Sequence, residues 1–270
     1  MKPSLRTVAT VDAARATVVL VGGHEGGGDV ALEPLPEQGP LLRASSARQH
    51  LQVAVQQALD TTDLPVCVVP MTLGRDPRLV ADSARTLLGL SGSVEPGRIV
   101  LADPFGSSTL LTGWLRVAVA GAAAVAGQPS ATDLAVVLTA KAANPFDDAE
   151  LFRIAHLVKV QESVPWVEVA LHGGDPNPAE VVDRCRKLGA RQITTIPADF
   201  EPPTKTPLPG VTDHGPLLSP ATISGMLATR IAGALLKLTR HDDGITTSLD
   251  ADHHQGHGGD AWREPDPNAG

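Results

Sequence analysis

A single histidine stands in a glycine-rich loop directly after a short apolar run. Residues 18–31 have the sequence VVLVGGHEGGGDVA, which places His24 and Glu25 at the centre of the loop. A neutral imidazole can bind a divalent metal ion or accept a proton, and the surrounding glycines let the backbone approach a large flat ligand. The pattern therefore indicates metal or acid–base chemistry at the end of a strand, with a solvated loop histidine as the alternative.

The same glycines do not form a recognisable nucleotide loop. A P-loop requires Lys followed by Ser or Thr after its glycines, and a dinucleotide fingerprint requires G-x-G-x-x-G in register. Residues 22–29, GGHEGGGD, fit neither pattern. Nucleotide binding is therefore disfavoured, whereas binding of another small anion by this loop stays open.

The apolar run and its loop recur once further along the chain. Residues 136–149 have the sequence VVLTAKAANPFDDA, in which Ala142 stands opposite His24. The repeated pairs are Val18 and Val136, Val19 and Val137, Leu20 and Leu138, Asp29 and Asp147, and Ala31 and Ala149. The repeat predicts two related halves, of which only the first keeps the histidine.

Short strands alternate with helices along both halves. Strands that are apolar at every position, as in a sheet buried on both faces, are predicted over 17–21, 66–69, 99–102, 134–138, 166–171 and 192–196. Apolar residues at helical spacing predict helices over 44–59, 110–126, 150–160, 178–188 and 220–238. Residues 32–50 show no strand. The alternation predicts α/β halves with mostly parallel open sheets, whose ligands bind beyond the carboxyl ends of the strands.

Organisation and composition limit the class of protein. We predict a first α/β half over residues 1–127, a second over 132–240, and a disordered tail rich in His, Asp and Gly over 241–270. The net charge of −8 argues against a nucleic-acid partner. No run reaches the ~18 apolar residues of a membrane span, and the N-terminus lacks the apolar segment of a signal peptide. We therefore expect a cytoplasmic protein without a membrane partner.

Three stretches resemble the class II tetrapyrrole chelatases, which insert cobalt, iron or nickel into sirohydrochlorin. Residues 19–29, VLVGGHEGGGD, are similar to the strand and Gly-His-Gly-Ser-type loop that begin this family. Residues 66–82, VCVVPMTLGRDPRLVAD, are similar to its next strand, proline and Gly-x-His-Val-x-x-Asp turn. Residues 167–197, VEVALHGGDPNPAEVVDRCRKLGARQITTIP, are similar to a later strand, loop, helix and strand. The resemblance covers about residues 15–238 and implies two similar α/β halves.

The resemblance also implies a chemistry. The divalent metal (cobalt, iron or nickel) would be a substrate, the partner a tetrapyrrole, and no organic cofactor would be needed. The family's first histidine maps onto His24 as metal ligand and proton acceptor, with Glu25 as a second catalytic group. The second maps, by counting from Pro70, onto Arg78, which cannot ligate a metal. His172 follows its predicted strand much as His24 does, so we hypothesise that it is the second metal ligand.

Three basic residues are candidates for binding the carboxylates of such a ring. They are Arg75, Arg78 and Lys141, all of which follow predicted strands. Guanidinium and ammonium groups pair with carboxylates through charge-assisted hydrogen bonds. We therefore expect them at the edge of the substrate site, with solvated surface charges as the alternative.

The predicted tail has four histidines, at positions 241, 253, 254 and 257. Short His-rich segments bind late divalent ions weakly, so the tail is a candidate for metal delivery. Two other functions stay open for the whole chain. One is a non-catalytic relative of the chelatases that binds tetrapyrrole or metal ions, and the other is an unrelated α/β protein that binds a small anion. A separation of ~5 Å between His24 and His172 would favour a shared ion, given metal–nitrogen distances near ~2 Å.

Overall fold

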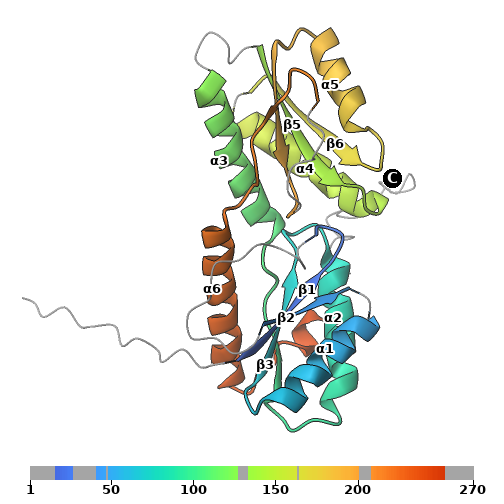
Figure 1. Ribbon diagram of the computed structural model, residues 1–270, viewed down its shortest axis with the longest axis vertical. Coiled ribbons are helices and arrows are strands. Elements are labelled where there is room, and N and C mark those ends of the chain that lie inside the picture. The colour runs from blue at the N-terminus through green and yellow to red at the C-terminus, as the bar shows by residue number, and fades with distance from the viewer. Residues whose placement is uncertain are drawn as a thin grey trace, which may run out of the picture.

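The described part of the chain forms two parallel β-sheets, one above the other in Figure 1 and each flanked by helices. The computed structural model describes residues 16–26, 41–46, 48–126, 133–162, 164–200 and 208–252. Each sheet has four strands, in the orders β2-β1-β3-β4 and β6-β5-β7-β8. All paired strands are parallel. The predicted α/β class with two similar halves is confirmed.

The N-terminal sheet is built around two fully buried strands. They are β1 (Thr17–Gly22) and β3 (Val66–Met71), with β2 (Leu41–Ser45) and β4 (Ile99–Leu101) at the edges. Val19 and Val21 pack with the helices α1 (Arg48–Thr61) and α2 (Pro77–Ser91). Val18 and Leu20 belong to the cluster on the opposite face. Both faces are covered, which explains the continuous apolar runs.

Strand β2 lies within residues 32–50, where no strand was predicted. Its sequence, LLRAS, has three exposed residues and only one that is buried. An edge strand of this kind lacks the apolar run by which the central strands were recognised. The prediction was wrong here because the strand is held by its hydrogen-bonded partner β1 and not by burial of its own side chains.

The C-terminal sheet repeats the arrangement. Strand β5 (Leu134–Lys141) lies between β6 (Trp166–His172) and β7 (Gln192–Pro197), with the short β8 (Thr212–Asp213) at one edge. Helix α4 (Pro145–Glu162) packs on one face and α5 (Pro178–Lys187) on the other. Helix α5 begins with a capping box formed by Asn177 and Glu180, at the start of the helix predicted over 178–188.

The last helix of each half packs on the sheet of the other half. Helix α3 (Ser108–Ala126) contacts α4, β5 and β7, whereas α6 (Pro220–Leu238) contacts β3 and β4 (Figure 1). The repeat had placed α3 with residues 1–127 and α6 with 132–240. The exchange arises because one hydrophobic cluster runs through both halves and includes Leu115 of α3 and Leu227 of α6. The two halves are therefore interlocked.

Helices α3 and α6 are also long and apolar enough to cross a membrane, judged by length and composition. No span was predicted from the sequence. Two such helices are weak evidence, because a core helix of a globular protein passes the same test. Both helices contribute buried side chains to the shared cluster, such as Leu111 and Ile231.

The predicted tail begins with an ordered segment. Leu101 N of β4 donates a hydrogen bond to Asp243 O at 2.8 Å, Ile245 is buried in the N-terminal core, and a 3₁₀ turn follows over Thr246–Ser248. Asp252 then accepts hydrogen bonds of 3.0 and 2.9 Å from Arg85 of α2. Residues 241–252 are therefore part of the fold. The histidines at 253, 254 and 257 lie outside the described residues.

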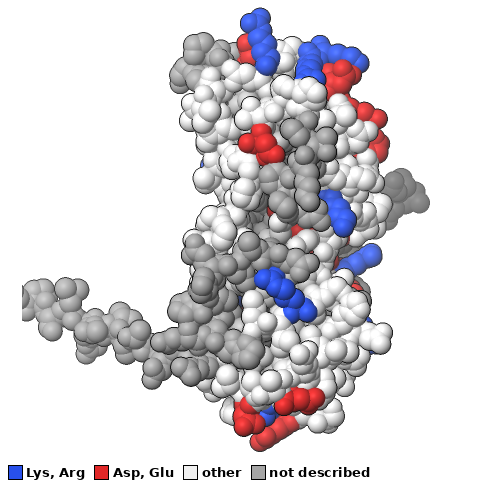
Figure 2. Space-filling view, in the orientation of Figure 1, with Lys and Arg blue, Asp and Glu red and all other residues white. Residues whose placement is uncertain are grey.

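The face of the molecule seen in Figure 2 is mostly uncharged. Lys, Arg, Asp and Glu gather toward its upper and lower ends, and a few basic side chains lie near the junction of the two halves (Figure 2). The described residues on this face form no continuous basic stripe that would match a nucleic-acid backbone.

Candidate metal site

The candidate site lies where the carboxyl ends of β1 and β3 meet the first turn of α4. Gly22 pairs with Met71 at the ends of the two strands, so the loops that follow them start side by side. The first loop contains His24, and the second ends at Asp76, the N-cap of α2. The C-terminal half contributes Asp147 from the start of α4. The topology thus brings together side chains from both halves.

These three side chains form the one group of potential metal ligands found in the described part of the chain. His24 Nδ1 lies 3.0 Å from Asp76 Oδ2 and 3.9 Å from Asp147 Oδ2. One ligand atom from each residue lies within 4.8 Å of the others. The imidazole is 19% exposed, and the carboxylates of Asp76 and Asp147 are 10% and 4% exposed. A cation between them would be bound by one nitrogen and two oxygens.

Local structure holds each carboxylate in place. Asp76 Oδ1 accepts a hydrogen bond of 3.0 Å from Leu79 N, which caps α2, while Oδ2 accepts one of 3.3 Å from His24 N. Asp147 Oδ2 accepts a hydrogen bond from the Asn144 side chain. The Asn144 Oδ1 atom in turn accepts one of 3.2 Å from Asp147 N. The two carboxylates are thus positioned by the N-terminal ends of α2 and α4.

Gly23 is required for the contact between the two loops. A Cβ atom at this position would lie 2.1 Å from Asp76 Oδ2 and 3.2 Å from Leu79 Cδ2. Real Cβ atoms essentially never approach another atom closer than 3.0 Å. The glycine before His24 therefore lets the Asp76 carboxylate reach the imidazole.

Burial and mutual charge shift the pKa values of all three groups. Burial lowers the pKa of His24, but the hydrogen bond and negative charge of Asp76 outweigh it and leave the pKa raised. Burial raises the pKa of Asp76, yet the bond and charge of His24 lower it overall. For Asp147, burial raises the pKa, and the positive charges of His24 and Arg78 offset this only in part. His24 and Asp147 are thus better proton acceptors than the free side chains.

Glu25 points away from this group into the protein. Its Oε2 atom accepts hydrogen bonds from the Thr72 hydroxyl and, at 3.0 Å, from Leu73 N. Its Oε1 atom lies 3.5 Å from Arg75 Nε, and both side chains are fully buried. Burial raises the pKa of Glu25. The charge of Arg75 and the hydrogen bond from Thr72 lower it, but they do not outweigh burial. The carboxylate joins the His24 loop to the Asp76 loop, so its place is that of a positioning residue.

The remaining predicted residues occupy different positions. Arg78 is exposed on α2, near enough to Asp147 for its charge to act on that carboxylate, whereas Arg75 is fully buried beside Glu25. Lys141 is the exposed last residue of β5, and its backbone N donates to Asp199 at 3.0 Å. His172, half-buried at the end of β6, pairs with Lys141 in the sheet. It does not belong to the group around His24.

Sequence reasoning missed Asp76 and Asp147. Counting from Pro70 selected Arg78, although Asp76-Pro77 is a typical helix start with an N-cap and a first-turn proline. Asp147 had been matched to Asp29 in the repeat but was not considered as a ligand. Its position three residues after Asn144, just before the helix predicted over 150–160, was the available signal.

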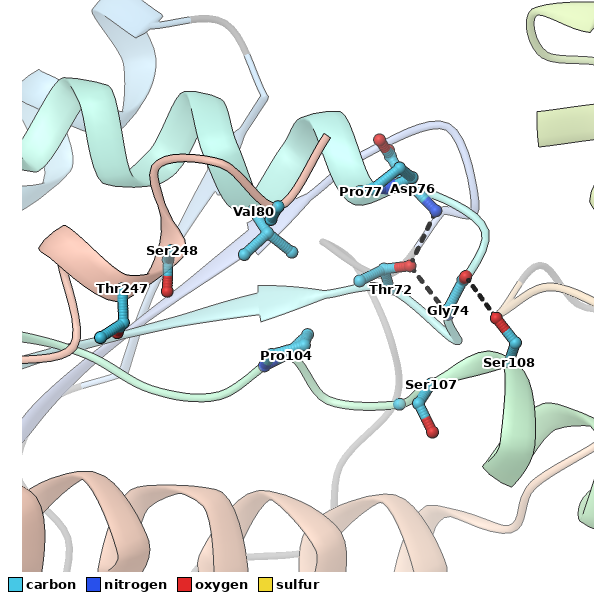
Figure 3. Close-up of a pocket in the computed structure, with 12 residues that line it drawn as sticks. Thr72, Gly74, Asp76, Pro77, Val80, Pro104, Ser107, Ser108, Thr247 and Ser248 are labelled. Carbon is cyan, nitrogen blue, oxygen red and sulfur yellow. Dashed lines mark hydrogen bonds between the residues drawn. The ribbon is translucent and has the colours of Figure 1, made fainter. Parts of the chain in front are cut away.

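A cavity of about 320 Å³ adjoins the site and shares Asp76 with it (Figure 3). The loop from Thr72 to Pro77 lines one side, and the start of α3 and the segment from Thr247 to Ala251 line the others. Gly74 N and Asp76 N both donate to Thr72 Oγ1, at 2.9 and 3.2 Å. The ordered part of the tail therefore forms one wall of a cavity next to the candidate ligands.

Comparison with solved structures identifies the fold. The structure of SirB from Bacillus subtilis with Fe3+ matches at a TM-score of 0.53 and 14% identity, covering 84% of this chain and 99% of that one. A sirohydrochlorin chelatase SirB from Bacillus subtilis subspecies spizizenii, in complex with cobalt, matches at 0.45 and 14%, covering 82% and 96%. No protein-family model and no curated protein sequence matches the chain. The chain has the chelatase-like fold that the resemblance predicted.

Proposed function

We propose that this protein inserts a divalent metal ion into sirohydrochlorin or a similar tetrapyrrole. The observation that carries the proposal is the group of His24, Asp76 and Asp147 at the junction of two halves. The fold shared with SirB, a protein whose structures contain Fe3+ or cobalt, supports the same reaction class. The metal ion is a substrate in this proposal, as is the tetrapyrrole.

The chemistry requires a metal holder and acceptors for two protons. A divalent ion replaces the two N–H protons of the ring, so both protons must pass to other groups as the metal–nitrogen bonds form. His24 and Asp147 have raised pKa values, which favours proton uptake by both. Each ligand that releases the ion becomes free to take a proton. The same side chains therefore serve first as metal ligands and then as proton acceptors.

Exposed basic residues near the junction are the proposed contacts to the ring's carboxylates. Arg78 is exposed and acts electrostatically on Asp147, and Lys141 is exposed at the end of β5. Basic side chains near the junction are visible in Figure 2. Arg75 is not included, because its guanidinium is fully buried beside Glu25. Arginine can bind a carboxylate through two parallel hydrogen bonds.

The tail is proposed to supply the metal. Asp252 is bound to Arg85, and Ala251 lines the cavity that also contains Asp76. The histidines at 253, 254 and 257 follow this anchor by one to five residues, and an extended chain spans at most ~3.3–3.6 Å per residue. Tethering so close to the site raises the local concentration of any ion that these imidazoles hold.

Insertion of Co²⁺ into sirohydrochlorin, followed by the change in absorption spectrum, tests the proposal. Background insertion without protein is subtracted, and Asp148→Asn serves as matched control for Asp147→Asn because the two carboxylates are neighbours in the first turn of α4. We expect insertion above background for the wild type and Asp148→Asn, and its loss in His24→Ala and Asp147→Asn. Absence of insertion by the wild type, with the ring or the metal still bound, would instead identify a non-catalytic binding protein.

A further inference from the structure

The donor set of the candidate site contains one imidazole nitrogen and two carboxylate oxygens. Both cysteines, Cys67 and Cys185, are buried elsewhere in the fold and do not belong to the group. Carboxylate oxygens suit early first-row ions such as Mn²⁺, whereas imidazole and sulfur ligands suit later ions such as Ni²⁺, Cu²⁺ and Zn²⁺. Two of the three donor atoms at this site are therefore oxygens, which favours ions that prefer oxygen ligands.

The separations of His24 from the two carboxylates suit a small octahedral ion. Ligands at ~2.1 Å from a cation and at right angles to each other are ~3.0 Å apart, and opposed ones ~4.2 Å. His24 Nδ1 lies 3.0 Å from Asp76 Oδ2 and 3.9 Å from Asp147 Oδ2, within that span. The ion would take the place of the proton that His24 and Asp76 share.

Charge favours a divalent cation at this site. Two carboxylates that are 10% and 4% exposed face one imidazole, so a divalent cation would neutralise two charges held largely away from water. Uncompensated charges in such surroundings are costly. Their attraction for a cation is mainly Coulombic, so it favours late over early ions less than the covalent contribution of a second imidazole would.

We propose that Asp76 and Asp147 set the metal preference of the site, and that this preference favours early first-row ions such as Mn²⁺ and Fe²⁺ more than an imidazole-rich site would. The inference rests on the proposed function, in that the same three residues hold the metal substrate. Asp76 is the main determinant, because its Oδ2 atom is the one in direct contact with His24. A second imidazole at this position would raise the relative affinity for late ions.

The test compares the affinities for Mn²⁺ and Ni²⁺ in the full chain, above the raised pKa of His24. Electron paramagnetic resonance measures free Mn²⁺, and calorimetry measures Ni²⁺ binding. The same titrations on His24→Ala give the contribution of the tail histidines, which is subtracted. The variants are Asp76→His and Asp147→His, with Asp148→His as matched control. Thermal unfolding establishes that each variant is folded, and Asp147→His carries the test if loss of the α2 cap destabilises Asp76→His.

We expect each substitution by His to shift the Ni²⁺ to Mn²⁺ affinity ratio toward Ni²⁺ by about tenfold or more, with no shift in Asp148→His. An unchanged ratio in folded Asp76→His and Asp147→His, or no His24-dependent binding of either ion, would overturn the inference. No tetrapyrrole takes part in these titrations. A shifted ratio without any insertion activity therefore refutes the proposed reaction alone, while insertion with an unchanged ratio refutes only the inference.

Discussion

Replacing Gly23 by alanine should move the Asp76 carboxylate away from the His24 imidazole, while both residues keep their identity. The new Cβ would lie 2.1 Å from Asp76 Oδ2, and 3.0 Å is the closest approach that real Cβ atoms show. The carboxylate must therefore move by about 1 Å. Its hydrogen bond to His24 Nδ1, now 3.0 Å long, would be lost or badly lengthened. A hydrogen bond to a charged group contributes about 1.5–3 kcal/mol to stability.

The pKa of His24 provides the sharpest assay. Burial alone lowers this pKa, and contact with Asp76 raises it above the ordinary value. Gly23→Ala weakens the second influence and leaves the first, so the pKa of His24 should be lower than in the wild type. An NMR titration of the imidazole resonances measures it directly.

Stability should change with pH in the same variant. A raised His24 pKa stabilises the folded state below the unfolded pKa of ~6.5, and this contribution disappears as the pH rises through the folded pKa. The lowered Asp76 pKa adds stability above ~3.9, which is lost as the pH falls through its folded pKa. Urea unfolding should therefore show the larger cost of Gly23→Ala at about pH 5.5 and a smaller cost at about pH 8.5.

Gly89→Ala is the matched control. Gly89 lies inside α2 with nothing within 4 Å of the Cβ that alanine would add. Alanine should stabilise the helix there by up to about 1 kcal/mol and leave His24 unchanged. If Gly23→Ala keeps the wild-type pKa of His24 and the wild-type stability at both pH values, the assigned contact between Asp76 and His24 is wrong.

Four further outcomes follow from the site and its supports. Asp147→Asn should weaken Co²⁺ binding, measured by calorimetry, by about tenfold or more, and Asp148→Asn should not. Metal affinity should fall by about one logarithmic unit per pH unit below the raised pKa of His24 and level off above it, because a proton and the ion compete for Nδ1; affinity that is flat across this range would contradict ligation by His24. Glu25→Gln should cost about 3 kcal/mol in urea unfolding by leaving buried Arg75 unpaired, and adding Arg75→Met should recover part of that loss rather than add to it. Ile245→Ala should cost about 2–5 kcal/mol because Ile245 is 1% exposed, whereas Leu236→Ala, at a position 53% exposed, should cost far less.

The strand positions were predictable because central strands of a parallel sheet are apolar throughout. The runs that predicted β1 and β3 are buried at every residue. His24 was likewise predictable as a candidate site residue, since it follows β1 at the carboxyl edge where ligands bind. Burial on both faces and the position of a loop can both be predicted from the local sequence.

Contacts between distant parts of the chain were harder to predict from the sequence. Counting residues from Pro70 led to Arg78, because the count did not consider the residue at which α2 begins. The helix starts at Pro77, and its N-cap Asp76 turns back toward His24. Similarly, the apolar stripes of α3 and α6 predicted two helices but could not say which sheet each would cover. That choice depends on a core shared by both halves.

This exchange of helices explains how a site divided between two halves can keep fixed dimensions. Asp147 approaches His24 from α4, which packs on a sheet that shares no strand with β1. If each half packed only on itself, the 3.9 Å separation of the two side chains would depend on a small interface, and domains joined in that way ordinarily move relative to each other. Here α3 begins directly after the N-terminal sheet and packs on the C-terminal one, while α6 returns to β3. Both connections pass through the shared core, so separating Asp147 from His24 requires the exposure of buried apolar surface. An ion held between them would add to that resistance, because both residues would then bind the same ion.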